Sequence, residues 1–137
     1  MHVIVVLDQE NGMLFNHRRQ SRDRNLRKAV LEQTRGHTLY MNAWSYRQFA
    51  EDGDAGIHVS EEGLALAGDG DYCFVENVAI APYAQRIQSL TVYRWNRRYP
   101  ADRYLDLSLT APEWKCVERT EFAGFSHEVI QKEVYIR

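Results

Sequence analysis

The chain has 137 residues, of which 45% are hydrophobic and 12% aromatic, and its formal net charge is −2. A chain of this length can bury a sizeable core in one domain, and this apolar content excludes intrinsic disorder. The small net charge gives no general attraction to nucleic acid or to an anionic membrane. No stretch approaches the roughly 18 apolar residues of a membrane-spanning helix. We therefore expect a single cytoplasmic domain over residues 1–137.

The first half of the chain alternates predicted strands and helices. Residues 3–7 form an unbroken apolar run, typical of a strand that is covered on both faces. A long loop is expected from Met13, and then a helix from Arg22 to about Thr34 with Ser21 as its N-cap. The elements predicted next are a strand over 38–41, a helix over 44–50, a turn at 52–54 and a strand over 56–59.

The second half changes from alternating elements to a hairpin. A helix with Pro82 in its first turn is expected to end near Gln88. Because the last two strands flank a short loop, we expect them to pair in antiparallel fashion. This order predicts an α/β fold with a mostly parallel central sheet, helices on both faces and a C-terminal antiparallel hairpin. The strands predicted in this half cover residues 72–75, 90–93, 103–107, 114–122 and 127–135.

Four segments resemble, in their order and spacing, segments of the dihydrofolate reductases. They are the opening strand with NGML after it, residues 36–49 (GHTLYMNAWSYRQF), residues 99–114 (YPADRYLDLSLTAPEW) and residues 125–137 (FSHEVIQKEVYIR). No single segment is highly specific, but together they span essentially the whole chain. The resemblance implies a divergent, shortened chain with a dihydrofolate reductase-like fold.

The resemblance also implies where a reductase of this family would hold its substrate, and the chain departs from the family there. The family's acid in the first helix holds the pterin and supplies the proton for reduction. That position falls at Leu26, and the nearest acid, Asp23, is expected to point elsewhere on the helix. The segment between Val59 and Tyr72 is also shorter than in the family.

The positions that would bind NADPH are replaced as well. The Arg that contacts the dinucleotide phosphates in the family falls at Ala43. Glu61 and Glu62 stand where the family binds the 2′-phosphate, and carboxylates repel that group. The family's Gly-Gly pair, which lets the backbone approach the cofactor, reads Glu76-Asn77 here. We therefore expect no NADPH-dependent reductase activity, no catalytic residue and no bound cofactor.

Two basic segments suggest a different function. Residues 17–28 carry six Lys or Arg against one Asp, and residues 93–99 interleave Arg with aromatic residues. Such a composition suits stacking on bases and contact with phosphates. A solvated helix face and an Arg-rich loop that pairs with Asp and Glu are the plainer interpretation. The anion-binding candidates are Arg18, Arg19, Arg94, Arg97 and Arg98.

These observations favour a degenerate dihydrofolate reductase-like protein that binds a small molecule or a protein partner, with no membrane role. One alternative is a divergent pterin- or folate-type oxidoreductase that uses NADPH. The other is an anion- or nucleic-acid-binding module built on the two basic segments. The residues expected to line a ligand cleft are Phe15, His17, Trp44, Tyr46, Tyr93 and Trp95.

Metal and thiol chemistry have little support in the sequence. The five histidines form no pair with metal-ligand spacing, and the acidic segment at 51–54 lacks the regular ligand spacing of a calcium loop. We therefore expect no metal. Ser126 and His127 are assigned to a turn, without a nucleophile elbow around them. Cys73 and Cys116 are expected to be buried, reduced thiols.

Overall fold

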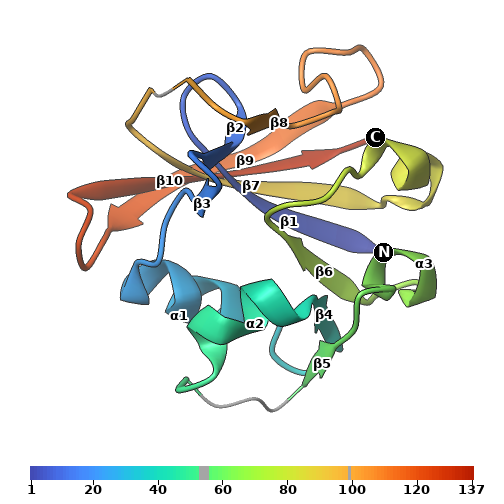
Figure 1. Cartoon of the computed structure of the whole chain (residues 1–137). Helices are drawn as coiled ribbons and strands as arrows, with labels where there is room; N and C mark the ends of the chain where they lie inside the picture. Colours follow the sequence, from blue (N-terminus) through green and yellow to red (C-terminus); the bar gives the residue numbers. More distant parts are fainter. Residues whose placement is uncertain (53–55, 99) are drawn as a thin grey trace.

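A computed structural model gives the fold and describes residues 1–52, 56–98 and 100–137. A seven-stranded sheet has the strand order β5-β4-β6-β1-β7-β10-β9 (Figure 1). The first five strands in this order are parallel, and β10 runs antiparallel to both β7 and β9. The prediction of a mostly parallel sheet with a C-terminal antiparallel hairpin is confirmed. The strands are β1 (His2–Leu7), β4 (Leu39–Met41), β5 (Ile57–Val59), β6 (Tyr72–Val75), β7 (Ser89–Trp95), β9 (Lys115–Ala123) and β10 (Val129–Ile136).

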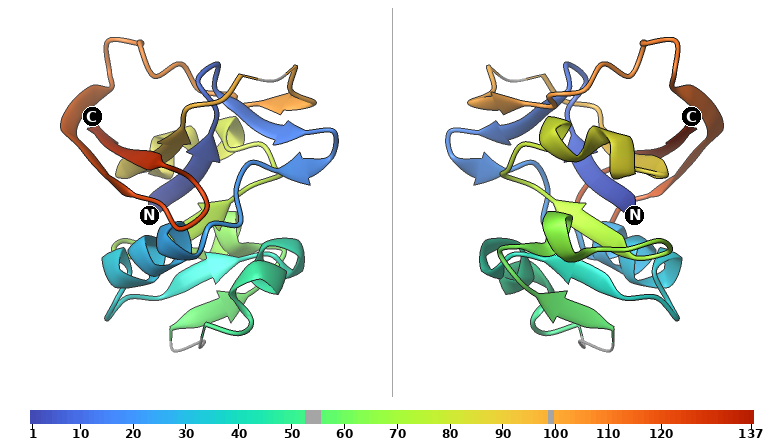
Figure 2. Two further views of the ribbon diagram at one scale, coloured as in Figure 1. Left: turned by 90° about the vertical axis from the view of Figure 1, so that its left-hand side faces the viewer. Right: turned by 90° about the vertical axis from the view of Figure 1, so that its right-hand side faces the viewer.

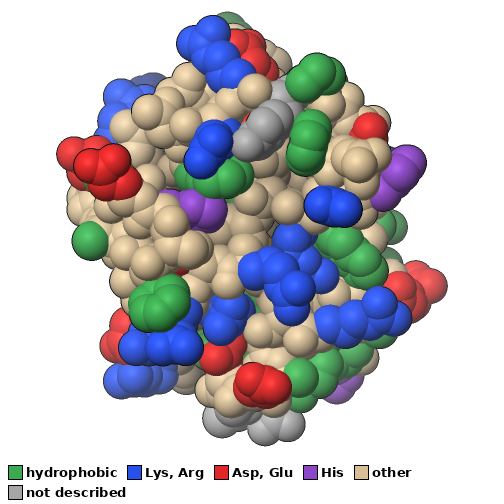
Figure 3. Space-filling view, turned by 60° about the vertical axis from the view of Figure 1, so that its left-hand side comes forward, with side chains coloured by type: hydrophobic (Ala, Val, Ile, Leu, Met, Phe, Trp, Pro, Cys, Tyr) green, Lys and Arg blue, Asp and Glu red, His purple; other side chains and the backbone are tan. Residues whose placement is uncertain are grey.

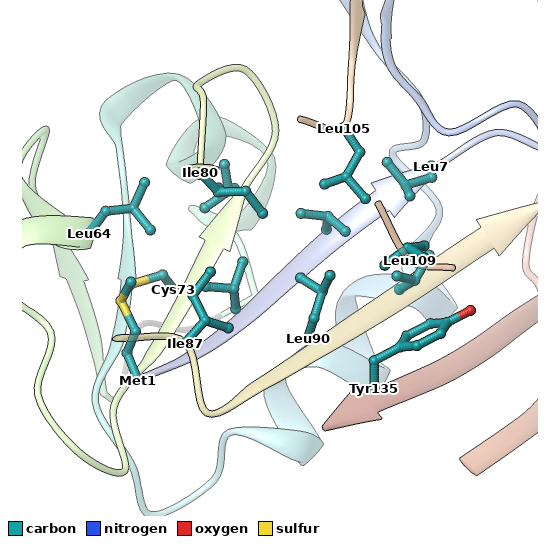
Figure 4. Close-up of a cluster of buried hydrophobic side chains, with 14 of the residues drawn as sticks. Met1, Leu7, Leu64, Cys73, Ile80, Ile87, Leu90, Leu105, Leu109 and Tyr135 are labelled. Atoms are coloured by element: carbon teal, nitrogen blue, oxygen red, sulfur yellow. The ribbon is translucent and has the colours of Figure 1, made fainter. Parts of the chain in front are cut away.

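Helices cover both faces of the sheet, as predicted (Figure 2). α1 (Arg24–Gln33) and α2 (Ala43–Phe49) lie on one face, and α3 (Gly63–Leu66) and the 3₁₀ helix η1 (Ala81–Arg86) lie on the other. Alternate residues of β1 enter the two cores because successive side chains of a strand point to opposite faces. Figure 4 shows part of the core on the α3 side. The core under α1 and α2 contains Ile4, Val6, Leu26, Val30, Leu39, Met41, Phe49, Phe74, Tyr93 and Ile130.

A second, three-stranded sheet replaces the long loop that was expected from Met13. Its order is β3-β2-β8, with β2 at Gly12–Phe15, β3 at Arg18–Arg19 and β8 at Arg103–Tyr104. Asn16 and His17 join β2 to β3 with φ values of 49° and 59°. Two residues with positive φ make the turn that suits a tight hairpin. The prediction was wrong because no glycine marks this turn.

The first helix begins at a different cap from the one predicted. Asp23, not Ser21, is the N-cap of α1, and its carboxylate accepts hydrogen bonds from the backbone N–H of Asn25 at 2.8 Å and of Leu26 at 3.2 Å. The Ser21 hydroxyl instead accepts from the Asp23 backbone N–H at 3.1 Å. The turn predicted at 52–54 lies mostly outside the described residues.

The two thiols differ in their surroundings. Both are free, and Cys73 is buried in β6 as expected. Cys116 is exposed, so the expectation of a buried thiol there was wrong. It lies in β9, the strand at the edge of the sheet, nearly all of whose residues are exposed. Among the described residues, no helix has the length and apolar character that a membrane crossing requires.

Candidate functional site

The carboxyl ends of β1 and β6 lie side by side, and a buried carboxylate follows each strand. Asp8 follows β1 and is completely buried, and Glu76 follows β6 and is 3% exposed. The chain leaves β1 toward β4 and leaves β6 toward β7, on opposite sides of the pair. Open α/β sheets bind ligands in the crevice formed at such a change of direction. We call this region, at the ends of β1 and β6, the central crevice.

Glu76 is held in the central crevice by an ion pair with β3. One oxygen of its carboxylate accepts from Nη1 of Arg19 at 2.8 Å, and the other accepts from Nε2 of Gln48 at 2.9 Å. Arg19 also donates from Nη2 to the Trp44 carbonyl at 3.0 Å, and its guanidinium lies 4.1 Å from the centroid of the Trp44 ring. The Glu76 side chain thus fills part of the crevice and is fixed from two directions.

The protonation of this ion pair is governed by burial. Burial raises the pKa of Glu76 to about 7, although the Arg19 guanidinium opposes that rise. Burial also lowers the pKa of Arg19, and the nearby cations Arg22 and Arg47 lower it further. The Glu76 carboxylate opposes this decrease. Lys and Arg side chains gather on this face of the molecule, over β3, α1 and α2 (Figure 3). The crevice therefore combines a carboxylate that titrates near neutral pH with an excess of cations.

A cavity of about 320 Å³ adjoins the ion pair. Asn77 is held there by a hydrogen bond from Nδ2 of Asn42 at 2.8 Å, and the backbone N–H of His17 donates to the Asp102 carboxylate. The cavity presents an indole, an amide, a carboxylate and a guanidinium, a set that suits a small polar ligand. Its lining residues are Leu14, His17, Trp44, Asn77, Asp102 and Arg103.

Asp8 holds the backbone just after β1, in the central crevice. Its Oδ1 accepts from the backbone N–H of Glu10 and of Gly12, both at 2.8 Å, and its Oδ2 has no hydrogen-bond partner among the described residues. A Cβ at Gly12 would lie 2.8 Å from Asp8 Oδ2 and 2.8 Å from the Ala101 side chain. This close approach requires glycine at position 12.

A carboxylate of the chain itself occupies the start of α2. Oε2 of Glu61 accepts from the backbone N–H of Ala43 at 2.9 Å, and Oδ1 of Asn42 accepts from that of Ser45 at 2.9 Å. The cavity between this point and α3 measures only about 60 Å³, which is room for a few water molecules. Two backbone donors at this helix start are thus already bonded to side chains of the chain itself.

Two further cavities lie beside Trp95, at the end of β7. The larger, of about 470 Å³, is lined by Trp95, Asn96, Arg97 and residues 126–129. The smaller, of about 230 Å³, shares Trp95, Asn96 and Val129 with it and extends to Gln9 and Glu121. The His127 ring lies against Trp95 with 3.8 Å between ring centroids, and the Arg97 guanidinium lies 5.0 Å from the same indole ring. We call the larger cavity the Trp95 pocket.

Ser21 and His127 meet beside the Trp95 pocket, although they are distant in sequence. The Ser21 hydroxyl lies 2.7 Å from Nε2 of His127, within hydrogen-bonding distance of a nucleophile and a base. However, Ser21 is buried and does not line the pocket. The Asp23 carboxylate bonds to the backbone of residues 125–127 and not to the imidazole. The three side chains therefore do not form a hydrolytic triad.

The six predicted cleft residues do not line one site. His17 and Trp44 line the cavity of the central crevice, and Trp95 lines the two cavities beside β10. Phe15 is half-buried in β2. Tyr46 packs against the core, and Tyr93 is fully buried, with its hydroxyl donating to Gln33 Oε1 at 2.7 Å.

The five predicted arginines are also dispersed. Arg19 pairs with Glu76 in the central crevice, whereas Arg94 pairs with Glu133 at 3.2 Å and Arg98 with Glu10 at 3.2 Å. Arg97 lies over Trp95, and Arg18 is exposed on β3. Three of the five therefore neutralise carboxylates of the chain. In the described part of the chain, no three His, Cys, Asp or Glu side chains gather as a metal site would require.

Comparison with known proteins identifies the fold. No protein-family model matches the chain, and no curated protein sequence matches it. Among solved structures, the chain is similar to the dihydrofolate reductase from Enterococcus faecalis complexed with NADP(H) and RAB-propyl. The TM-score is 0.68 and the sequence identity 11%, over 99% of this chain and 95% of that chain. The chain has a dihydrofolate reductase-like fold. The fold predicted from the sequence is confirmed, and at this identity the likeness concerns the fold alone.

Within the dihydrofolate reductase-like fold, the departures noted in the sequence have specific structural consequences. Leu26 is 1% exposed in the core under α1, so no acid faces the crevice from that position. Glu61 is bonded to the Ala43 backbone, and Glu76 is bonded to Arg19. Sequence reasoning treated Glu76 only as a lost glycine. Its position directly after a buried parallel strand was the signal that could have marked it as a crevice residue.

Proposed function

We propose that this chain is a binding protein that holds a small polar ligand in its central crevice and does not catalyse NADPH-dependent reduction. The observation that carries the proposal is the Glu76 carboxylate, buried at the end of β6 and fixed by Arg19 and Gln48. In the family, glycines at this position let the backbone approach the cofactor. A fixed, buried side chain there occupies space that the dinucleotide needs.

Two other features support the absence of reduction. The Glu61 carboxylate takes the backbone N–H of Ala43, and its negative charge repels a phosphate group. The aliphatic side chain of Leu26 can neither hold a pterin nor transfer a proton.

We also propose a cytoplasmic location for the chain. The two free thiols fit that location, because disulfides are rare there.

The lining of the cavity indicates the class of ligand. Arg103 supplies a cation, Asp102 supplies a carboxylate, and Asn77 supplies an amide, while Trp44 offers an apolar edge beside them. The volume of about 320 Å³ is at the lower end of small-molecule sites. The proposed ligand is therefore a compact polar molecule with both donor and acceptor groups, smaller than a dinucleotide.

Isothermal titration with NADPH and with dihydrofolate tests the negative part of the proposal, together with a spectroscopic assay for NADPH oxidation. We expect neither binding nor turnover. A micromolar dissociation constant for NADPH, or turnover by the unmodified chain, would overturn the proposal.

A thermal-shift screen of small polar metabolites tests the positive part. We expect a ligand that raises the melting temperature of the unmodified chain and of the control Arg98→Ala, whose arginine lies on the surface beside Glu10. The same ligand should fail to stabilise Arg103→Ala or Asn77→Leu. Equal stabilisation of all four proteins would show that the ligand binds outside the central crevice.

A further inference from the structure

The Trp95 pocket is distinct from the central crevice and is built from separate elements. Its walls come from the end of β7 and from the loop that joins β9 to β10, around Ser126, His127 and Glu128. None of the residues that line it also lines the cavity beside Trp44. The function proposed above therefore leaves this pocket without a role.

Three buried polar side chains hold the pocket in its shape. Oε1 of Gln20 accepts from the indole Nε1 of Trp95 at 3.1 Å, and Ser21 bonds to His127 at 2.7 Å. Asp23 accepts from the backbone N–H of Phe125, Ser126 and His127 at 2.7 to 3.0 Å. Each of the three is at most 6% exposed. Side chains that are locked in this way by buried hydrogen bonds are the usual support of a binding site.

The same network sets the Ser21 hydroxyl against Nε2 of His127. The Ser21 oxygen accepts from the Asp23 backbone N–H, and the only acceptor described for its own hydrogen is Nε2 of His127. In the tautomer in which Ser21 donates to Nε2, the neutral ring carries its hydrogen on Nδ1. Burial lowers the pKa of His127, which favours this neutral form. That tautomer offers the pocket an N–H donor in addition to the Asn96 amide and the Arg97 guanidinium.

The indole and the guanidinium together indicate the kind of ligand. Arg97 is exposed and stacks on Trp95 as a flat cation. A flat aromatic ring can take its place on the indole, and the guanidinium then forms paired hydrogen bonds with an anionic group of the same ligand. We propose that the Trp95 pocket binds a nucleoside monophosphate, with the base on Trp95 and the phosphate on Arg97, Asn96 and His127.

The charges at the edge of the two cavities favour a single nucleotide over a strand. Glu128 lines the larger cavity and Glu121 the smaller, and both are exposed. A phosphate backbone running along both cavities would pass two carboxylates, which repel it. One phosphate placed on Arg97 avoids that repulsion.

Titration calorimetry with AMP, GMP, CMP and UMP, accompanied by tryptophan fluorescence, tests the proposal. We expect at least one of them to bind with a dissociation constant below about 1 mM, and its nucleoside and inorganic phosphate to bind at least about tenfold more weakly. Arg97→Ala should weaken binding by about tenfold or more, whereas Arg98→Ala, at the adjacent and also exposed arginine, should leave it unchanged. Trp95→Phe should remove most of the fluorescence change while the protein stays folded.

Three results would overturn the proposal. One is the failure of all four nucleotides to bind. Another is equal loss of affinity in Arg97→Ala and Arg98→Ala, which would indicate general attraction to surface charge. The third is loss of binding in Arg103→Ala with none in Arg97→Ala, which would assign the nucleotide to the central crevice. A failure of the Trp95 pocket is therefore distinguishable from a failure of the function proposed for the crevice.

Discussion

Replacing Glu76 by glutamine should stabilise the protein at high pH, although it removes one partner of an ion pair. Burial raises the pKa of Glu76 from its ordinary value of 4.5 to about 7 in the folded state. Between these two pKa values, the folded chain keeps a proton on Glu76 that the unfolded chain has released. The contribution of the protonated carboxyl to folding stability is therefore fully present below pH 4.5 and is lost as the pH rises through 7. The difference between the two pKa values corresponds to about 3 kcal/mol.

The contribution of Glu76 is measured from the unfolding free energies of the unmodified chain and of Glu76→Gln, by urea denaturation at several pH values between about 4 and 8. We expect the unfolding free energy of Glu76→Gln to gain about 3 kcal/mol relative to the unmodified chain over that range. His2 and His127, whose pKa values are lowered by burial, contribute an opposite slope to both proteins, which cancels in the comparison. The matched control is Glu32→Gln, which breaks an exposed pair with Arg35 and should change stability by less than about 1 kcal/mol at every pH. If the unmodified chain gains stability relative to Glu76→Gln as the pH rises, then Arg19 keeps the carboxylate ionised and the reasoning fails.

Three further substitutions test the supports of the site, each by urea denaturation. Leu26→Asp should cost about 3 to 5 kcal/mol, since it buries an unpaired carboxyl, and should not create dihydrofolate turnover; measurable turnover would contradict the proposal that NADPH no longer binds. Asp23→Ala should cost about 2 kcal/mol or more. Because hydrogen bonds to the carboxylate hold the pKa of Asp23 well below its usual range, against the effect of burial, this cost should shrink as the pH falls below about 4; a constant cost would contradict the charge-assisted role. Gly12→Ala should cost about 1 to 3 kcal/mol because its Cβ meets Asp8 and Ala101, and an unchanged midpoint would show that this turn can shift.

The strands and main helices were predictable because local patterns determine them. The apolar run at residues 3–7 became β1, and residues 72–75 match β6 in full. Their lack of polar alternation indicated strands with both faces covered, and the two cores on either side of the sheet agree. Pro82 lies in the first turn of η1, as expected. The sequence pattern could not distinguish a 3₁₀ helix from an α-helix there.

The binding features were harder to predict because they join residues that are far apart in the chain. Ser21 meets His127 across 106 positions, and Gln20 meets Trp95 across 75. Neither pair has a spacing rule, since the first depends on how the loop between β9 and β10 meets the segment before α1, and the second on how the end of β7 meets that segment. The aromatic and basic character of residues 93–99 was visible in the sequence. The sequence did not show that the arginines of this segment make different contacts. Arg94 pairs with Glu133, whereas Arg97 stacks on Trp95.

The polar groups of the central crevice fit the proposed binding role better than they fit a role in stabilising the fold. A buried ion pair is often no more stabilising than apolar side chains of similar size, because both charges lose their hydration. At the end of β6 an apolar residue would simply extend a buried strand, yet Glu76 stands there with a pKa raised to about 7. Beside it, Gln48 Oε1 and Asp8 Oδ2 are buried without a hydrogen-bond partner among the described residues. Unsatisfied buried polar atoms are uncommon, and they concentrate where a protein binds or reacts. In this chain they lie where the dihydrofolate reductase-like sheet changes direction, which is the place that a ligand of the crevice would occupy.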